Sequence, residues 1–208
     1  ALQKKYAHGK QIDNVIQTNG TLLTDEWCEF FAQNHWLVGI SIDGPQEYHD
    51  YYRVTPAGKP SWEKVMQGIS LLKKHRVEWN AMAVANAYNA EHPLEFYHFF
   101  RDNGCQYLQF TPIVERLTEH EDGRTLASLA DDREIPLADA SVTPTQWGNF
   151  LYTIFDDWVR HDVGKTFVEI FDCTLANWMG VLPGICAYSK ECGHAGVMEH
   201  NGDVYSCD

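Results

Sequence analysis

Short apolar runs of strand length alternate with helical segments along most of this 208-residue chain. The predicted strands cover residues 13–18, 36–42, 77–85, 107–110 and 167–170. The predicted helices cover residues 25–34, 61–75, 93–103 and 144–164, with a helical turn at 174–179. Strands that alternate with helices form a parallel sheet, and their near-continuous apolar character indicates burial on both faces. The sequence therefore predicts an α/β fold, without separating a barrel from an open, doubly wound sheet.

Capping residues mark the starts of several predicted helices. Thr24 and Ser61 stand directly before two of them, and Thr143-Pro144 places a cap and a proline at the start of a third. Residues 118–142 interrupt the pattern, because they are rich in Glu, Asp, Ala and Arg and show no clear period. We expect this segment to be an insertion or a mobile loop.

The charge balance limits the partners that this chain can have. It carries 29 acidic and 16 basic residues, a formal net charge of -13, and such a surface repels nucleic acids and anionic membranes. No apolar run approaches the length of a membrane span, and the first residues show no signal-peptide pattern. We expect a cytoplasmic protein that binds neither nucleic acid nor membranes.

The cysteines fall into two groups. Cys28, Cys105 and Cys173 are scattered among apolar neighbours, and we interpret them as small buried hydrophobic residues. The other three crowd near the end of the chain, with the spacing C-x5-C-x14-C: Cys186, Cys192 and Cys207. In a reducing cytoplasm this grouping does not imply disulfides.

Asn201-Gly202 lies between two alternating runs and predicts a β-hairpin with a type I′ turn. Such a hairpin would bring Cys207 close to Cys192, and thiolates gathered in this way bind soft metal ions or an iron–sulfur cluster. Three thiolates are one fewer than a cubane cluster normally uses. A zinc site completed by His194, and a single disulfide with one free thiol, are the alternatives.

Three segments taken together resemble one known family. They read QTNGTL at 17–22, VGISIDGP at 38–45 and NGDVYSCD at 201–208, and His49, Arg53 and LQF at 108–110 extend the match. In this order they resemble the anaerobic sulfatase-maturating enzymes, a branch of the radical S-adenosylmethionine (radical SAM) proteins with a C-terminal SPASM domain. The resemblance covers nearly the whole chain and is weakest at 118–142.

The resemblance implies a fold and a set of cofactors. Residues 1–180 would belong to a partial (β/α)6 TIM-like barrel, and residues 181–208 would start the cysteine-rich SPASM extension. Family members bind S-adenosylmethionine on a 4Fe–4S cluster and carry two auxiliary clusters in that extension. The C-x3-C-x2-C motif of the radical-generating cluster and the Gly-Gly-Glu-Pro segment are absent here. We therefore expect an internal fragment of a longer enzyme, inactive by itself.

The resemblance also implies an activity. Family enzymes oxidise a Cys or Ser of a sulfatase polypeptide to formylglycine. The implied partners are that polypeptide and an electron donor such as flavodoxin or ferredoxin. The deoxyadenosyl radical removes a β-hydrogen, and a carboxylate takes the thiol or hydroxyl proton. A maturase that acts on another peptide, a non-catalytic regulator that binds sulfatases, and a zinc-stabilised α/β domain are the alternatives.

Several residues match the family's cofactor and substrate sites. Ser41 matches the position that contacts the cofactor's ribose, and Arg53 matches an arginine that could clamp its methionine carboxylate. Val114 matches an apolar position whose backbone meets the cofactor. Gln17 and Asn19, at the end of a predicted strand, would bind substrate. Without the resemblance, Ser41 would be an ordinary strand-end serine and Arg53 a surface charge. The two amides would be turn residues.

The remaining matches lie at the end of the chain. Cys186, Cys192 and Cys207 match three ligands of the first auxiliary cluster, and Asp208 matches the family's proposed general base. A carboxylate acts as a base only when its pKa and reach suit the proton that it takes. Without the resemblance, Asp208 would be a solvated terminal acid.

Overall fold

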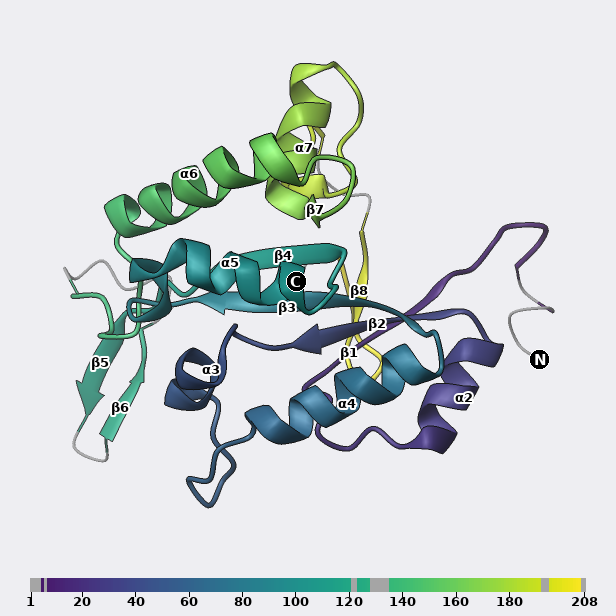
Figure 1. Cartoon of the computed structure of the whole chain (residues 1–208), viewed down its shortest axis with the longest axis horizontal. Helices are drawn as coiled ribbons and strands as arrows, with labels where there is room; N and C mark the ends of the chain where they lie inside the picture. Colours follow the sequence, from purple (N-terminus) through teal and green to yellow (C-terminus); the bar gives the residue numbers. More distant parts are fainter. Residues whose placement is uncertain (1–4, 6, 121–122, 128–134, 192–194, 207–208) are drawn as a thin grey trace.

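A parallel sheet of five strands forms the centre of the molecule (Figure 1). The computed structural model describes residues 5, 7–120, 123–127, 135–191 and 195–206. The strands are β1 (Asn14–Thr18), β2 (Trp36–Ser41), β3 (Glu78–Ala85), β4 (Tyr107–Pro112) and β7 (Phe167–Val168). Their order in the sheet is their order along the chain, and each neighbouring pair is parallel. A doubly wound sheet reverses its order at a switch point, so this order is that of part of a (β/α) barrel.

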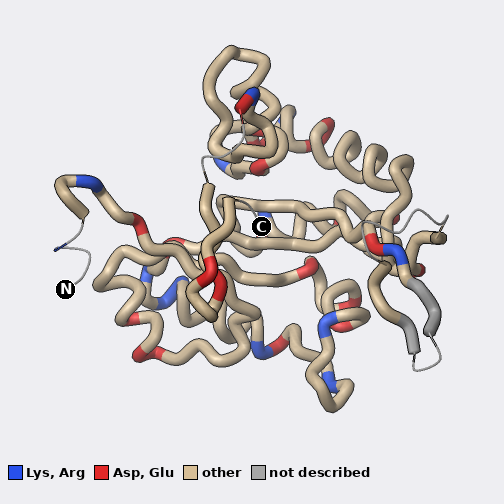
Figure 2. Tube along the Cα trace, turned by 180° about the vertical axis from the view of Figure 1, so that it is seen from behind, with Lys and Arg blue, Asp and Glu red and all other residues tan. Residues whose placement is uncertain are grey.

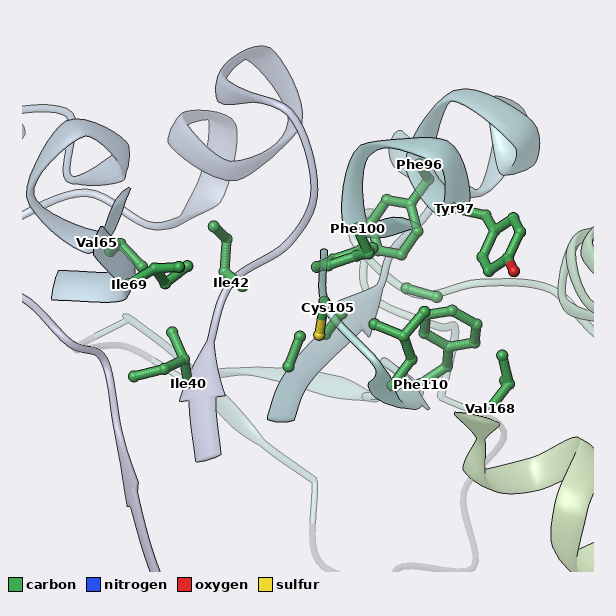
Figure 3. Packing of buried hydrophobic residues seen from close by; sticks show 14 of the residues in the cluster. Ile40, Ile42, Val65, Ile69, Phe96, Tyr97, Phe100, Cys105, Phe110 and Val168 are labelled. Atoms are coloured by element: carbon green, nitrogen blue, oxygen red, sulfur yellow. The ribbon is translucent and has the colours of Figure 1, made fainter. Parts of the chain in front are cut away.

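Helices cover one face of this sheet. They are α2 (Asp25–Gln33), α3 (Gln46–Tyr52), α4 (Trp62–Lys74), α5 (Pro93–Asp102), α6 (Pro144–His161) and α7 (Glu169–Trp178), with 3-10 turns η1 (Asn89–Glu91) and η2 (Cys186–Tyr188). Figure 3 shows Ile40 of β2 beside Val65 and Ile69 of α4. Phe96 of α5 packs against Phe110 of β4. The hydrophobic core therefore lies between the sheet and these helices.

The opposite face of the sheet carries both polar and apolar side chains and is partly exposed. By the strand register this face carries Gln17 and Asn80 and, alternating with buried core positions, Ser41, Met82 and Gln109. The prediction of burial on both faces is therefore wrong for the described part of the chain. The strand β1 is also an edge, because within the described residues it pairs only with β2. The side chains of Val15 and Ile16 in this strand are 66% and 38% exposed.

Two predicted helix caps form as expected and a third does not. Thr24 caps α2, and Thr143 forms a capping box at the start of α6. Ser61 stands at the N-cap position of α4, but its side chain does not cap the helix. Asp50 caps it instead, because its Oδ1 accepts hydrogen bonds from the backbone N–H groups of Ser61 and Trp62, at 2.8 and 2.9 Å.

Three segments differ from the prediction. The sequence does not predict helix α3, since the residues QEYHDYY show no apolar period. Residues 118–142, expected to be irregular, overlap an antiparallel hairpin of β5 (Leu117–His120) and β6 (Gly123–Leu126). The predicted strand at 167–170 ends at Val168, because α7 begins at Glu169 and replaces the shorter helical turn predicted at 174–179.

The C-terminal hairpin forms, but with another turn. Strand β8 (Val197–Met198) pairs antiparallel with β9 (Val204–Tyr205). The N–H of Gly202 donates to the carbonyl of Glu199 at 2.9 Å, and Gly202 has a φ of +91°. Asn201 does not have a positive φ. A type I turn followed by a left-handed glycine has this pattern, so the predicted type I′ turn is wrong.

Acidic residues are spread along the chain, including the C-terminal hairpin, with Lys and Arg among them (Figure 2). The net charge of -13 is thus not gathered in one element. Among the described residues, the helices are all too short or too polar to cross a membrane.

Candidate functional site

Three predicted site residues lie at or just after the carboxyl ends of their strands: Ser41 and Val114, assigned to the cofactor, and Gln17, assigned to the substrate. Gln17 is the next-to-last residue of β1, Ser41 is the last residue of β2, and Val114 follows β4. In barrels of parallel strands this edge carries the functional residues. The structure thus brings the sequence-predicted residues of three strands to one edge of the sheet.

A direct hydrogen bond joins two of these residues. The Nε2 of Gln17 donates to the Oγ of Ser41 at 3.3 Å, and both side chains lie on the open face of the sheet. Ser41 is 9% exposed, whereas Gln17 is exposed. A Cβ at the neighbouring Gly39 would lie 2.9 Å from the Sδ of Met82, so the glycine leaves room for that side chain on the open face.

Arg53 is bound to the end of the same strand β2, although it follows helix α3. Its Nε donates to Asp43 Oδ2 at 2.5 Å, and its Nη2 donates to Asp43 Oδ1 at 3.1 Å. The side chain of Asp43 is 5% exposed and that of Arg53 is 30% exposed. Asp43 Oδ1 also accepts the backbone N–H of Val84 in β3, at 2.8 Å. Arg53 is therefore an ordered, ion-paired residue at the strand ends rather than a free surface charge.

The geometry of this pair leaves part of the guanidinium free for a second anion. A guanidinium has five N–H donors in a planar fork, and Asp43 uses only the edge formed by Nε and Nη2. The end formed by Nη1 and the second hydrogen of Nη2 can donate to another carboxylate. Sequence reasoning misses Asp43 as a site residue, although its place directly after a buried strand is a usable signal.

Asn19 and Val114 lie at the same edge with weaker contacts. Asn19 Oδ1 accepts hydrogen bonds from the backbone N–H and the hydroxyl of Thr21, at 3.1 and 2.9 Å. This is turn chemistry, which is the alternative interpretation of that residue. Val114 is 62% exposed beside Ile113, whose N–H donates to the carbonyl of Ala85 at 2.9 Å. A role of Asn19 in substrate binding, and of Val114 in cofactor binding, stays a prediction.

Comparison with known proteins finds similar proteins in one family. The model of the radical SAM superfamily matches residues 1–100. The chain is 71% identical, over 207 residues, to a serine-type anaerobic sulfatase-maturating enzyme of Bacteroides thetaiotaomicron, a match covering 100% of this chain and 50% of that protein. It is 33% identical over 195 residues to a cysteine-type enzyme of Clostridium novyi, covering 93% and 48% of the two chains. The whole chain is thus similar to about half of an anaerobic sulfatase-maturating enzyme, and its first 100 residues match the radical SAM superfamily.

Solved structures of the sulfatase-maturating family share the fold. One, described as native anSMEcpe with bound AdoMet, has a TM-score of 0.79 and 28% identity, covering 99% of this chain and 53% of that chain. Another, native anSMEcpe with bound AdoMet and the Cp18Cys peptide, has a TM-score of 0.77 and 29% identity, covering 100% and 55%. The prediction of a TIM-like barrel segment is therefore confirmed. The chain spans about half the length of the curated relatives it matches.

The cysteines that the family match assigned to a cluster are mostly outside the described residues. Cys186 lies in η2 and is partly exposed, whereas Cys192, Cys207 and Asp208 fall outside the described part of the chain. Within the part that is described, no three His, Cys, Asp or Glu side chains gather as a metal site. The other group behaves as predicted, because Cys28, Cys105 and Cys173 are buried. Burial raises the pKa of Cys105 to about 11, which keeps it a thiol.

A cavity of about 910 Å³ lies toward the other end of the strands, and it reaches Asn80 and Gln109 on the open face but is not lined by Ser41 or Arg53. Its lining includes residues at the starts of β3 and β4 together with Glu169 and Asp172 of α7 and Ile185, next to Cys186. Burial raises the pKa values of Glu169 and Asp172. Sequence reasoning did not single out this end of the sheet, because the residues that line the cavity come from separate elements.

Proposed function

We propose that this chain is part of a radical SAM oxidoreductase that oxidises a Ser or Cys of a sulfatase polypeptide to formylglycine. The identity of 71% with a serine-type sulfatase-maturating enzyme, over the whole chain, carries this proposal. The cofactors are S-adenosylmethionine and 4Fe–4S clusters, and the electron donor is of the flavodoxin or ferredoxin class. A cytoplasmic location stays a prediction.

Residues at the carboxyl edge of the sheet would hold the cofactor. The hydroxyl of Ser41 can donate to and accept from a ribose diol while its Oγ still accepts from Gln17. The free end of the Arg53 guanidinium fits a methionine carboxylate, since Asp43 occupies only the other edge. Val114 offers backbone groups from the end of β4. Gln17 and Asn19 would face the substrate from the end of β1.

The end of the chain would supply the rest of the site. Cys186, Cys192 and Cys207 are proposed ligands of the first auxiliary cluster, and Asp208 is the proposed base for the target's hydroxyl or thiol proton. When bound, S-adenosylmethionine and its cluster would supply the radical that takes one hydrogen atom from the target's β-carbon. The auxiliary cluster would accept the second electron of the oxidation, and with a Cys target water would then replace the sulfur, which leaves as hydrogen sulfide. The family match supports these assignments.

The test uses the full-length protein that contains this chain, reconstituted anaerobically with iron and sulfide. It is given S-adenosylmethionine, a reductant and matched sulfatase peptides with Ser, Cys or Ala at the target position. We expect a formylglycine product, detected by mass spectrometry, from the Ser or the Cys peptide and never from the Ala peptide. Cleavage of S-adenosylmethionine without product from either peptide would favour a maturase of another peptide.

The variant Asp208→Asn separates catalysis from cofactor cleavage. We expect it to cleave S-adenosylmethionine while forming no formylglycine, because the proton of the target side chain then has no acceptor. Normal formylglycine yield would remove Asp208 from the mechanism. Iron analysis of the same preparations tests the remaining alternatives. Zinc in place of iron would indicate a zinc-stabilised domain, and a lack of both iron and activity would favour a non-catalytic regulator.

A further inference from the structure

A chain of three hydrogen bonds connects the two halves of the Asp43–Arg53 ion pair, and the buried side chain of His49 makes two of them. The backbone N–H of Asp43 donates to His49 Nδ1 at 3.2 Å. The other ring nitrogen, Nε2, lies 3.0 Å from the Oγ of Ser61. The hydroxyl of Ser61 donates to the backbone carbonyl of Arg53 at 2.6 Å. The chain of contacts therefore begins at Asp43 and ends at Arg53.

The direction of each bond fixes the state of the imidazole. Because a backbone N–H can only donate, Nδ1 must accept, and the ring proton therefore sits on Nε2 and donates to Ser61. Burial lowers the pKa of His49, which is 1% exposed, and so favours the neutral ring that this pattern needs. The charged groups that face the ring are Asp43, Asp50 and Arg53.

These hydrogen bonds fix both ends of the segment 43–61, which carries Arg53. At one end, Asp43 is held to β3 by the N–H of Val84. At the other end, Ser61 is held by Asp50 through its backbone N–H and holds Arg53 through its hydroxyl. The orientation of the guanidinium follows from the two fixed ends, because Asp43 binds one edge of it in a bidentate manner.

We propose that His49 is a positioning residue that, through Asp43 and Ser61, orients the guanidinium of Arg53 to receive the carboxylate of S-adenosylmethionine. This inference rests on the proposed function. Filling the core would not require a histidine, since an apolar side chain fills the same volume without polar atoms to satisfy. The two nitrogen atoms of His49 instead reach the two partners that set one ion pair.

The test compares two ligands that differ in one group. S-adenosylmethionine carries the carboxylate, and decarboxylated S-adenosylmethionine lacks it. Binding of each is measured by anaerobic equilibrium dialysis, without reductant, to the reconstituted full-length protein. We expect His49→Leu and Ser61→Ala to bind S-adenosylmethionine about tenfold more weakly. Binding of the decarboxylated ligand should be unchanged, because Arg53 has no carboxylate to receive.

Two control variants separate positioning from general loss of structure. Ser61→Thr keeps the hydroxyl, so it should bind S-adenosylmethionine as the unmodified protein does. Tyr97→Phe removes a buried hydroxyl that donates to Asp162 at 2.8 Å, outside this network, and should leave the affinities for both ligands unchanged.

The outcomes distinguish the inference from the proposed function. One outcome is that Arg53→Met weakens the binding of S-adenosylmethionine alone, whereas His49→Leu and Ser61→Ala weaken the binding of both ligands equally or of neither. In that case the positioning role of His49 is wrong, and the proposed cofactor site is retained. If Arg53→Met changes the affinity for the two ligands equally, the carboxylate does not bind at Arg53, and the proposed role of His49 is wrong as well.

Discussion

Arg53→Met is expected to weaken the binding of S-adenosylmethionine by about a hundredfold, because it removes a charge-assisted pair of hydrogen bonds to the cofactor's carboxylate. It should also lower the free energy of unfolding by about 2–3 kcal/mol, because Asp43 is left as a buried carboxylate without its cation. Equilibrium dialysis measures the first effect, and urea unfolding measures the second.

A double variant separates these two effects. In Asp43→Asn with Arg53→Met, the side chain at position 43 carries no charge but keeps an oxygen that can accept the N–H of Val84. We expect most of the lost stability to return while the affinity stays low. Recovery of S-adenosylmethionine binding in the double variant would show that Arg53 acts on stability alone and does not bind the carboxylate.

Gly68→Ala is expected to lower the free energy of unfolding by about 2–4 kcal/mol. Gly68 lies inside α4, where the helix packs against the turn that follows β1. A Cβ at this position would overlap the backbone carbonyl oxygen of Gly20 and would lie 3.3 Å from Leu23 Cδ1. A backbone oxygen cannot rotate away as a side chain can, so the helix or the turn must move.

Gly148→Ala is the matched control, because it makes the same change inside another helix, α6. A Cβ at Gly148 would meet nothing within 4 Å, and the position therefore has room for a methyl group. Alanine favours the helix over glycine, so this variant should stabilise the protein by about 0.5–1 kcal/mol. In urea unfolding, the midpoint concentration should be lower for Gly68→Ala and higher for Gly148→Ala than for the unmodified protein. Equal shifts would contradict the close approach of α4 to Gly20.

The elements that could be predicted are those whose own sequence carries a period or a cap. The strands β2 and β3 are apolar runs of the right length, and Thr143 with Pro144 marks the start of α6. The helix α3 carries no such signal, and its first turn has no side-chain cap. The segment that contains α3 is held by tertiary contacts of His49 and Asp50, which a local pattern cannot reveal.

The candidate site was predictable only in part for the same reason. Ser41 and Arg53 were found through the family's motifs, and Gln17 lies where the end of a strand was expected. Asp43 was missed, because its importance depends on a pairing with Arg53 that crosses helix α3. The open face was also predicted to be buried, since apolar residues such as Met82 on that face hide the alternation of polar and apolar positions along the strands.

The strand β1 has a further consequence for handling the protein. Within the described residues it pairs with a strand on one side only, β2, and the side chains of Val15 and Ile16 beside it are exposed. Backbone of that kind can recruit a strand from another molecule. Preparations of these residues in isolation should therefore be judged first by their state of association, since intermolecular sheet growth would hide the cofactor edge that β1 shares with β2.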